Sequence, residues 1–107
     1  MAEITTPEPN VLSLSGEIDL HESPQLRQAF EALIKKKTPR VVVNFTGVSY
    51  IDSSGLAAFV EAAQRIRAYG GKFAFYGLRD NVRAIFELSK LDQFFSICPD
   101  KGSALEA

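Results

Sequence analysis

Residues 50–56 read Tyr-Ile-Asp-Ser-Ser-Gly-Leu, and they join a segment with strand character to one with helix character. Before them, residues 41–45 (Val-Val-Val-Asn-Phe) are mostly β-branched and almost continuously apolar, which is typical of a strand covered on both faces. After them, residues 54–69 carry apolar side chains at helical spacing, namely Leu56, Phe59, Val60, Ala63 and Ile66 or Arg67. The sequence therefore predicts a strand, a loop over residues 46–52, and a helix.

The flanking segments continue this alternation of strands and helices. Upstream, the predicted elements are strands at residues 4–6 and 11–15 around the Pro-containing turn 7–10, then a helix at 24–36 with Ser23 as its N-cap. Downstream, they are a strand at 73–76, a helix capped by Asp80 or Asn81, a strand at 94–97, and a possible short helix at 102–106. The order ββαβαβαβ(α) indicates an α/β fold with a mixed sheet of four to five strands and helices packed against it.

Length and composition restrict the classes of function. With 107 residues, the chain has room for one domain, expected to span residues 1–107. The formal net charge of −1 argues against nucleic acid as a partner. The one run of like charges, Lys35 to Lys37, is interpreted as solvated cations that oppose the dipole at the end of a helix. No apolar stretch exceeds five residues and no secretory signal is recognised, so neither membrane insertion nor export is expected and the predicted location is cytoplasmic.

Residues that could support catalysis are sparse. There is no Gly-rich phosphate loop and no His-Glu-x-x-His motif, and Cys98, the only cysteine, is predicted to be a buried, inert thiol. His21 is a lone histidine in a polar loop, so no metal and no cofactor are expected. A hydrolase built from Ser53, His21 and Asp19 is disfavoured: the hydrolase elbow has a glycine two residues before its serine, and this chain does not. The chain is therefore not expected to be an enzyme.

The turn at residues 52–55 (Asp-Ser-Ser-Gly) reads first as a helix cap, supplied by Asp52 or Ser53. A phosphate on Ser53 would add a charge of roughly −1.5 to −2 beside the Asp52 carboxylate. The start of the helix favours an anion by about 0.3–1 kcal/mol, whereas an unpaired charge buried at an interface costs on the order of 2–5 kcal/mol. Phosphorylation at this turn should therefore weaken binding of a partner and leave the fold intact.

The helix that follows the turn offers a possible docking surface. Gly55 is expected to leave the first turn of the helix uncrowded, so that a partner's backbone can approach. Ala57, Ala58 and Ala62 are expected on the exposed side of the helix, where small side chains let another chain come close; alanine as a good helix former is the competing explanation.

Several motifs in this order resemble those of STAS domains, and among them the bacterial anti-sigma factor antagonists. They are Leu-Ser-Gly-Glu-Ile-Asp at residues 14–19, Val-Val-Asn-Phe at 42–45, Tyr-Ile-Asp-Ser-Ser-Gly-Leu at 50–56, Gly-Gly-Lys at 70–72, Val-Arg-Ala-Ile-Phe at 82–86 and Leu-Asp-Gln-Phe-Phe at 91–95. The resemblance covers nearly the whole chain. One departure is Ala57-Ala58-Phe59, where the family often has Gly-Val or Gly-Ile, and this could alter the choice of partner.

The resemblance implies a partner-switching cycle. The unphosphorylated antagonist binds an anti-sigma factor that is also an ATP-dependent serine kinase, and this binding releases the sigma factor. The kinase then phosphorylates Ser53, with Ser54 as the alternative acceptor, the complex separates, and a serine phosphatase restores the antagonist. The residues expected to contact the partner are Asp19, Asp52, Ser53, Ser54, Gly55, Leu56, Ala57 and Ala58. A monomer that forms a heterocomplex is expected. The alternative is a STAS subunit of a lipid-transport complex, or another STAS regulator that does not act on a sigma factor.

Overall fold

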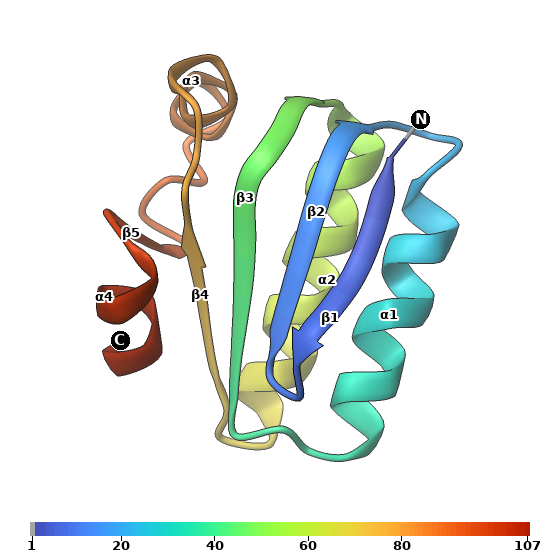
Figure 1. Ribbon diagram of the computed structural model, residues 1–107, viewed down its shortest axis with the longest axis vertical. Coiled ribbons are helices and arrows are strands. Elements are labelled where there is room, and N and C mark those ends of the chain that lie inside the picture. Colours follow the sequence, from blue (N-terminus) through green and yellow to red (C-terminus); the bar gives the residue numbers. More distant parts are fainter. Residues whose placement is uncertain (1) are drawn as a thin grey trace.

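The computed structural model describes residues 2–107, which form a five-stranded sheet and four helices (Figure 1). In chain order the elements are β1 (Glu3–Glu8), β2 (Val11–Ile18), α1 (Ser23–Lys35), β3 (Arg40–Ile51), α2 (Ser53–Ala68), β4 (Lys72–Tyr76), α3 (Asp80–Leu88), β5 (Ser96–Cys98) and α4 (Lys101–Glu106). The strands lie in the order β1-β2-β3-β4-β5, with β1 antiparallel to β2 and all other neighbours parallel. This arrangement confirms the predicted α/β fold with a mixed sheet.

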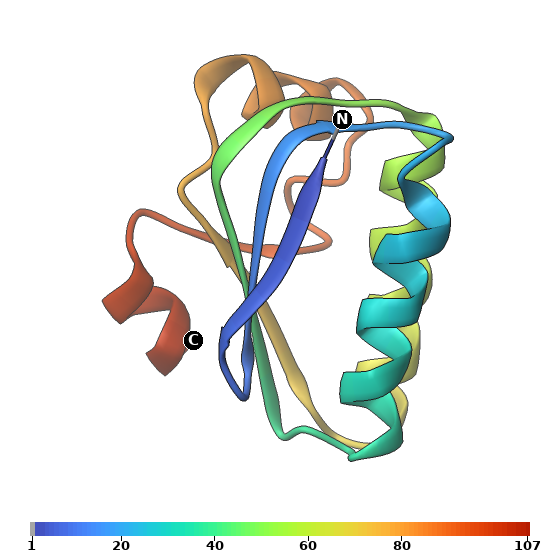
Figure 2. The same ribbon diagram turned by 45° about the vertical axis from the view of Figure 1, so that its right-hand side comes forward.

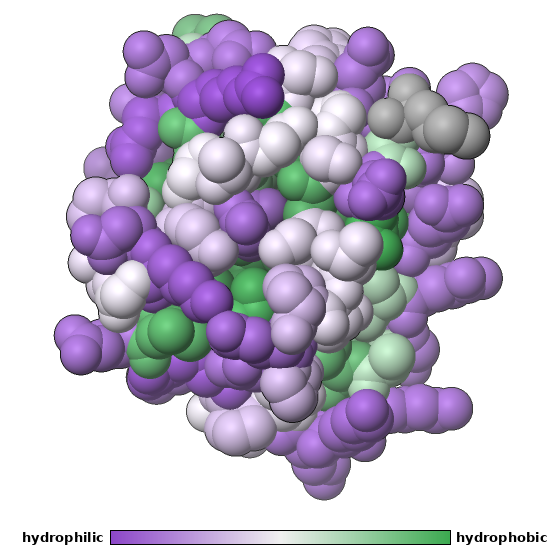
Figure 3. All heavy atoms as spheres, in the orientation of Figure 1, coloured by the Kyte–Doolittle hydropathy of each residue, from purple (hydrophilic) through white to green (hydrophobic). Residues whose placement is uncertain are grey.

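The helices cover the two faces of the sheet unequally. Helices α1 and α2 lie side by side on one face, and the short helix α4 packs on the other (Figures 1 and 2). Helix α3 lies across the end of the sheet at which β2, β3 and β4 finish (Figure 1). On the face away from α1 and α2, hydrophobic side chains reach the surface only in small, separate patches (Figure 3). In the described chain no helix is both long enough and apolar enough to cross a membrane.

The central strand β3 contributes to both sides of the sheet, as its apolar sequence predicts. Val41, Val43 and Phe45 belong to the main core beneath α1 and α2, where Phe45 contacts Phe59 with ring centroids 5.2 Å apart. Val42 faces the opposite way, into a smaller cluster with Val11, Ala74 and Ala104 of α4. All four of these β3 side chains are fully buried, so the prediction of a strand covered on both faces is confirmed.

The loop predicted over residues 46–52 is wrong, because β3 continues as a strand to Ile51. The continuation pairs with the end of β2, which itself runs past Gly16 to Ile18 instead of stopping at the glycine. The pairing of β2 with β3 has two irregularities, and such irregular pairing tolerates the polar residues that made the segment resemble a loop. Gly16 lies at one of them, with a positive φ of 84°.

Two helix caps also differ from the prediction. Helix α1 has Glu22 at its N-cap, whereas Ser23 is buried and its hydroxyl donates to the Leu20 carbonyl at 3.3 Å. Helix α3 has Arg79 at its N-cap, and Asp80 lies in the first turn. Neither N-cap side chain accepts a hydrogen bond from its helix, so capping propensity did not select these boundaries.

The last strand begins two residues later than predicted, at Ser96, and ends one residue later, at Cys98. Phe95 is buried against Phe75, with ring centroids 4.7 Å apart, and it belongs to the turn before β5. Phe95 is an aromatic residue that packs in the core, and its presence led the sequence to predict a strand that begins too early. Cys98 ends β5 and is half-buried, not buried as expected; burial and the nearby Asp100 carboxylate both raise the pKa of its thiol.

Candidate functional site

The parallel pairing of β2 and β3 brings the two predicted acidic residues, Asp19 and Asp52, to one edge of the sheet. Ile18 at the end of β2 is the register partner of Ile51 at the end of β3, so Asp19 and Asp52 directly follow neighbouring strands. The Asp52 backbone N–H donates to the Ile18 carbonyl at 3.1 Å, which extends the pairing into the turn. The turn at residues 52–55 and the loop after β2 therefore share the carboxyl edge of the sheet, at the top of Figure 1.

Asp52 is the N-cap of α2, which settles the choice between Asp52 and Ser53. Its backbone is extended (φ −102°, ψ −175°), and its Oδ1 accepts hydrogen bonds from the N–H groups of Ser54 at 2.9 Å and Gly55 at 3.0 Å. Two of the donors that a helix start leaves unpaired are thus satisfied by one carboxylate.

Ser53 is the first residue of α2, and its side chain is exposed. Within residues 2–107 its hydroxyl has no hydrogen-bond partner, whereas Ser54 is half-buried. The two adjacent serines therefore differ in accessibility, and Ser53 is the more exposed of the two.

Asp19 shapes the loop between β2 and α1. Its carboxylate accepts hydrogen bonds from the backbone N–H groups of His21 at 3.0 Å and Glu22 at 3.3 Å, and its carbonyl accepts from Glu22 and Ser23. The carboxylate thus holds the backbone of its own loop beside the serine turn. The described hydrogen bonds leave the His21 imidazole without a bond to Asp19, so the orienting contact of a catalytic triad is absent.

Gly55 serves packing and does not open the surface to a partner, contrary to the expectation from sequence. A Cβ at this position would lie 2.8 Å from Ile51 Cγ1 and 2.9 Å from both Ile18 Cγ2 and the Ile18 carbonyl oxygen. Glycine is required because the first turn of α2 approaches the ends of β2 and β3 too closely for a side chain.

The expected exposed alanine surface is also partly wrong. Ala58 and Ala62 are 2% and 3% exposed, because they face α1, whereas Ala57 is exposed. Leu56 is half-buried and packs against the core. Of the eight residues expected to contact a partner, Gly55 and Ala58 are therefore buried, and the remaining six stay accessible to some degree.

Two exposed apolar side chains at this edge were not identified from the sequence. Leu20, in the loop after Asp19, is 67% exposed, and Tyr50, two residues before Asp52, is 47% exposed. Both residues lie in segments that the sequence predicted as loops, where no helix or strand periodicity was expected to identify them. The edge thus combines exposed apolar groups with the acidic side chains of Glu17, Asp19, Glu22 and Asp52. Within the described residues, no group of three or more His, Cys, Asp or Glu side chains is placed to hold a metal ion.

The mixed sheet with a capped serine turn after its central strand defines an α/β domain of the STAS type. The chain matches the STAS domain family over residues 2–104 and belongs to that family. It is 32% identical to the anti-sigma-B factor antagonist of Listeria monocytogenes over 84 residues, which are 78% of this chain and 74% of that protein.

Solved structures with the same fold include other proteins of this kind. An anti-sigma factor antagonist from Mycobacterium paratuberculosis aligns with a TM-score of 0.84 and 26% identity, covering 99% of this chain and 91% of that one. SpoIIAA aligns in its unphosphorylated form with a TM-score of 0.71 and 16% identity, and the Bacillus protein in its phosphorylated form with 0.70 and 19%. These alignments cover 99% of this chain and 94% and 97% of the SpoIIAA chains, and they establish a shared fold.

Proposed function

We propose that this protein is an anti-sigma factor antagonist whose binding to its anti-sigma factor is ended by phosphorylation of Ser53. The observation that carries the proposal is the exposed, unbonded Ser53 hydroxyl at the start of α2, next to a carboxylate that is already engaged as the cap. The antagonist names of the Listeria and Mycobacterium relatives support the same role. Ser54 is the less suitable acceptor because it is half-buried.

A phosphate on Ser53 would meet a helix start whose donors are partly occupied. The Ser54 and Gly55 N–H groups already donate to Asp52 Oδ1, so the phosphate cannot bond to them unless it displaces the cap. The helix dipole still favours an anion there, by about 0.3–1 kcal/mol. The phosphate therefore remains a largely solvated dianion beside Asp52, with Asp19 on the neighbouring loop.

A partner that covers this turn would have to desolvate or pair that dianion. An unpaired charge buried at an interface costs on the order of 2–5 kcal/mol, which corresponds to about 30-fold to several thousand-fold weaker binding. The cost to the partner exceeds the local stabilisation at the helix start, so phosphorylation acts on the complex more than on the fold. SpoIIAA offers a precedent for a fold that is kept after phosphorylation, since its unphosphorylated and phosphorylated forms align with this chain almost equally well.

In the proposed cycle this chain supplies the acceptor and the binding surface. The kinase transfers the γ-phosphoryl group of ATP to Ser53 Oγ, ADP leaves, and the hydroxyl proton passes to a base on the kinase. A serine phosphatase then hydrolyses the phosphoserine. The partner surface is assigned to Ser53 and its accessible neighbours, which are Asp19, Asp52, Ser54, Leu56 and Ala57. The protein is proposed to act as a monomer that forms a heterocomplex, in the cytoplasm.

The proposal is tested by incubating the protein with ATP and its purified cognate serine kinase and measuring intact mass. One phosphate is expected on the wild type and on Ser54→Ala, the matched control, and none on Ser53→Ala. Phosphorylation of Ser53→Ala to the wild-type extent would overturn the assignment of the acceptor. A pull-down that recovers lipid-transport components and no kinase would replace the antagonist role with the transport alternative.

A further inference from the structure

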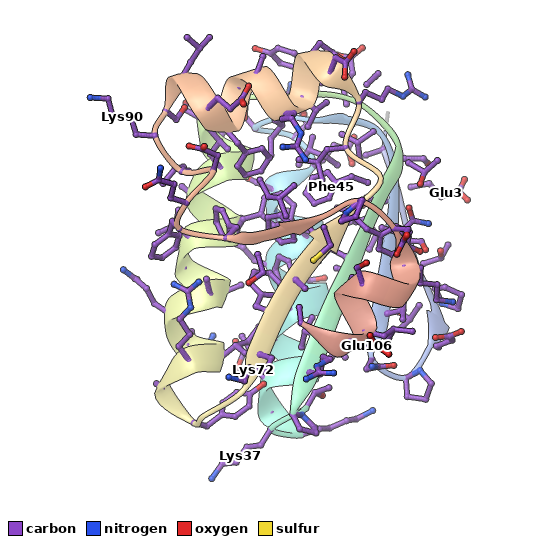
Figure 4. The ribbon with its side chains drawn as sticks, turned by 90° about the vertical axis from the view of Figure 1, so that its left-hand side faces the viewer. Glu3, Lys37, Phe45, Lys72, Lys90 and Glu106 are labelled. Carbon is purple, nitrogen blue, oxygen red and sulfur yellow. The ribbon has the colours of Figure 1, made fainter. Side chains whose placement is uncertain are left out.

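Cationic side chains, four exposed lysines and one half-buried arginine, gather at the end of the molecule opposite Ser53. We call this cluster the basic pole, and it consists of Lys35, Lys36, Lys37, Arg40 and Lys72. The first three follow the end of α1, and the other two begin β3 and β4. Figure 4 shows Lys37 and Lys72 at the same end of the fold. The chain joins these segments closely, since the Lys72 N–H donates to the Pro39 carbonyl at 2.8 Å.

No residue of the basic pole forms an ion pair within the described chain, although Lys35 lies close enough to Glu31 to help lower the pKa of that carboxyl. The ion pairs among residues 2–107 are Arg27–Glu61, Arg65–Glu31 and Lys101–Glu8, and none of them uses a residue of the pole. Arg40 and Lys72 are register partners at the start of the adjacent parallel strands β3 and β4, so the chain places two cationic residues side by side there. The positive charges of these two residues are therefore available to a partner.

A hollow opens between these cations and the β1–β2 hairpin. It has a volume of about 390 Å³ and is lined by Pro9, Asn10, Lys36, Thr38, Pro39 and Arg40. The two prolines supply apolar surface, while Lys36 and Arg40 supply positive charge at its rim. Arg40 is held in place by a hydrogen bond from its guanidinium to the Leu105 carbonyl of α4. This combination suits an apolar side chain flanked by carboxylates.

We infer that the basic pole is a second docking surface, which binds an acidic polypeptide segment and takes one of its apolar side chains into the hollow between Pro9 and Pro39. A membrane is a poorer match, because the large exposed apolar residues of the described chain are Leu20, Tyr50 and Leu88, none of which lies at the pole. Nucleic acid is a poorer match as well, because no exposed aromatic side chain of the described residues accompanies these cations to stack on bases.

This second surface operates independently of the Ser53 turn. The longest dimension of the molecule is 30 Å, and the two surfaces lie at opposite ends of β3. The Debye length is about 8 Å at physiological ionic strength, so a phosphate on Ser53 has little effect on charges at the pole. The acidic segment therefore binds equally well to the phosphorylated and unphosphorylated protein, and the inference does not rest on the proposed function.

The test is an NMR titration of the isotope-labelled full-length protein with the synthetic peptide Glu-Glu-Leu-Glu-Glu-Leu. Saturable shifts are expected at residues 8–10, 36–40 and 72, and they should weaken as salt is added. The double variant Lys36→Gln/Lys72→Gln should bind about 2- to 30-fold more weakly, the range for two exposed ion pairs. Arg83→Gln, an exposed cation on α3, is the matched control, and Ser53→Asp should bind the peptide like the wild type.

Several outcomes would overturn this inference. Absence of saturable shifts, equal binding of the Gln-Gln-Leu-Gln-Gln-Leu peptide, or equal losses in the Arg83→Gln control would show that the pole is not an acidic-peptide surface. Tighter binding to phosphatidylserine vesicles or to duplex DNA than to the peptide would reassign the pole to a membrane or to nucleic acid. None of these results affects phosphorylation of Ser53, so failure here is distinct from failure of the proposed function.

Discussion

Replacing Asp52 by alanine removes the side chain that caps α2. Its Oδ1 satisfies two backbone N–H groups, at 2.9 Å and 3.0 Å, and one of them belongs to the buried Gly55. Loss of an N-cap costs about 0.5–2 kcal/mol, and a donor left unpaired away from water places this site in the upper part of that range. We therefore expect Asp52→Ala to lower the free energy of unfolding by about 1–2 kcal/mol. The melting temperature should fall by about 4–16 °C.

Asp52→Asn is the matched control, because asparagine caps a helix about as well as aspartate but carries no charge. Urea unfolding followed by circular dichroism should show a lower midpoint for Asp52→Ala, with an unchanged slope, and a midpoint near wild type for Asp52→Asn. If the alanine variant were as stable as wild type, the cap would not stabilise the turn. If both variants lost stability equally, the charge of Asp52 and not its hydrogen bonds would be responsible.

Three further changes probe other parts of the structure. Gly55→Ala should lower the free energy of unfolding by about 0.5–2 kcal/mol, since overpacking against two buried isoleucines outweighs the gain in helix propensity; a thermal melt unchanged or raised would contradict this. Because the pKa of Cys98 is raised, its alkylation by iodoacetamide should be slower than that of a free thiol at neutral pH and should accelerate as the pH rises; a faster rate at neutral pH would refute it. The Asp100 carboxylate accepts a hydrogen bond from the Ser103 N–H, which lowers its pKa, so the stability it adds is present above its unfolded pKa and disappears as the pH falls through the folded one. Asp100→Asn should therefore reduce the loss of unfolding free energy that accompanies a fall in pH through the acid range. If the variant lost as much stability at acid pH as the wild type, the Asp100 carboxylate would not contribute to that loss.

The alternation of strands and helices could be predicted from sequence because it depends on local periodicity. The apolar residues 41–45 predicted a strand that is buried on both faces, and β3 does bury Val42 on one face of the sheet and Val43 on the other. The continuation of β3 to Ile51 could not be predicted, because it depends on pairing with β2, some thirty residues earlier in the chain. Bulged pairing tolerates polar residues that otherwise favour a loop, so propensity alone gave the wrong boundary.

The site was predictable in its position but not in the orientation of its side chains. Asp52 and Ser53 are both good N-caps, and only the extended backbone of Asp52 shows which of them caps α2. Ala58 is as good a helix former on a buried face as on an exposed one, so its burial against α1 follows from tertiary packing. Leu20 and Tyr50 were missed because both lie in segments predicted as loops, to which no helix or strand periodicity was assigned.

A phosphate on Ser53 is expected to end binding of the anti-sigma factor without unfolding the protein. The most direct measurement is isothermal titration of the purified cognate anti-sigma factor with the unphosphorylated protein and with protein fully phosphorylated on Ser53. We expect the Kd to rise by about 30-fold to several thousand-fold on phosphorylation, with the far-ultraviolet circular dichroism unchanged and with Ser53→Ala binding like the unphosphorylated form. A phosphorylated protein that binds within a few-fold of the unphosphorylated one, or that has lost its fold, would contradict it.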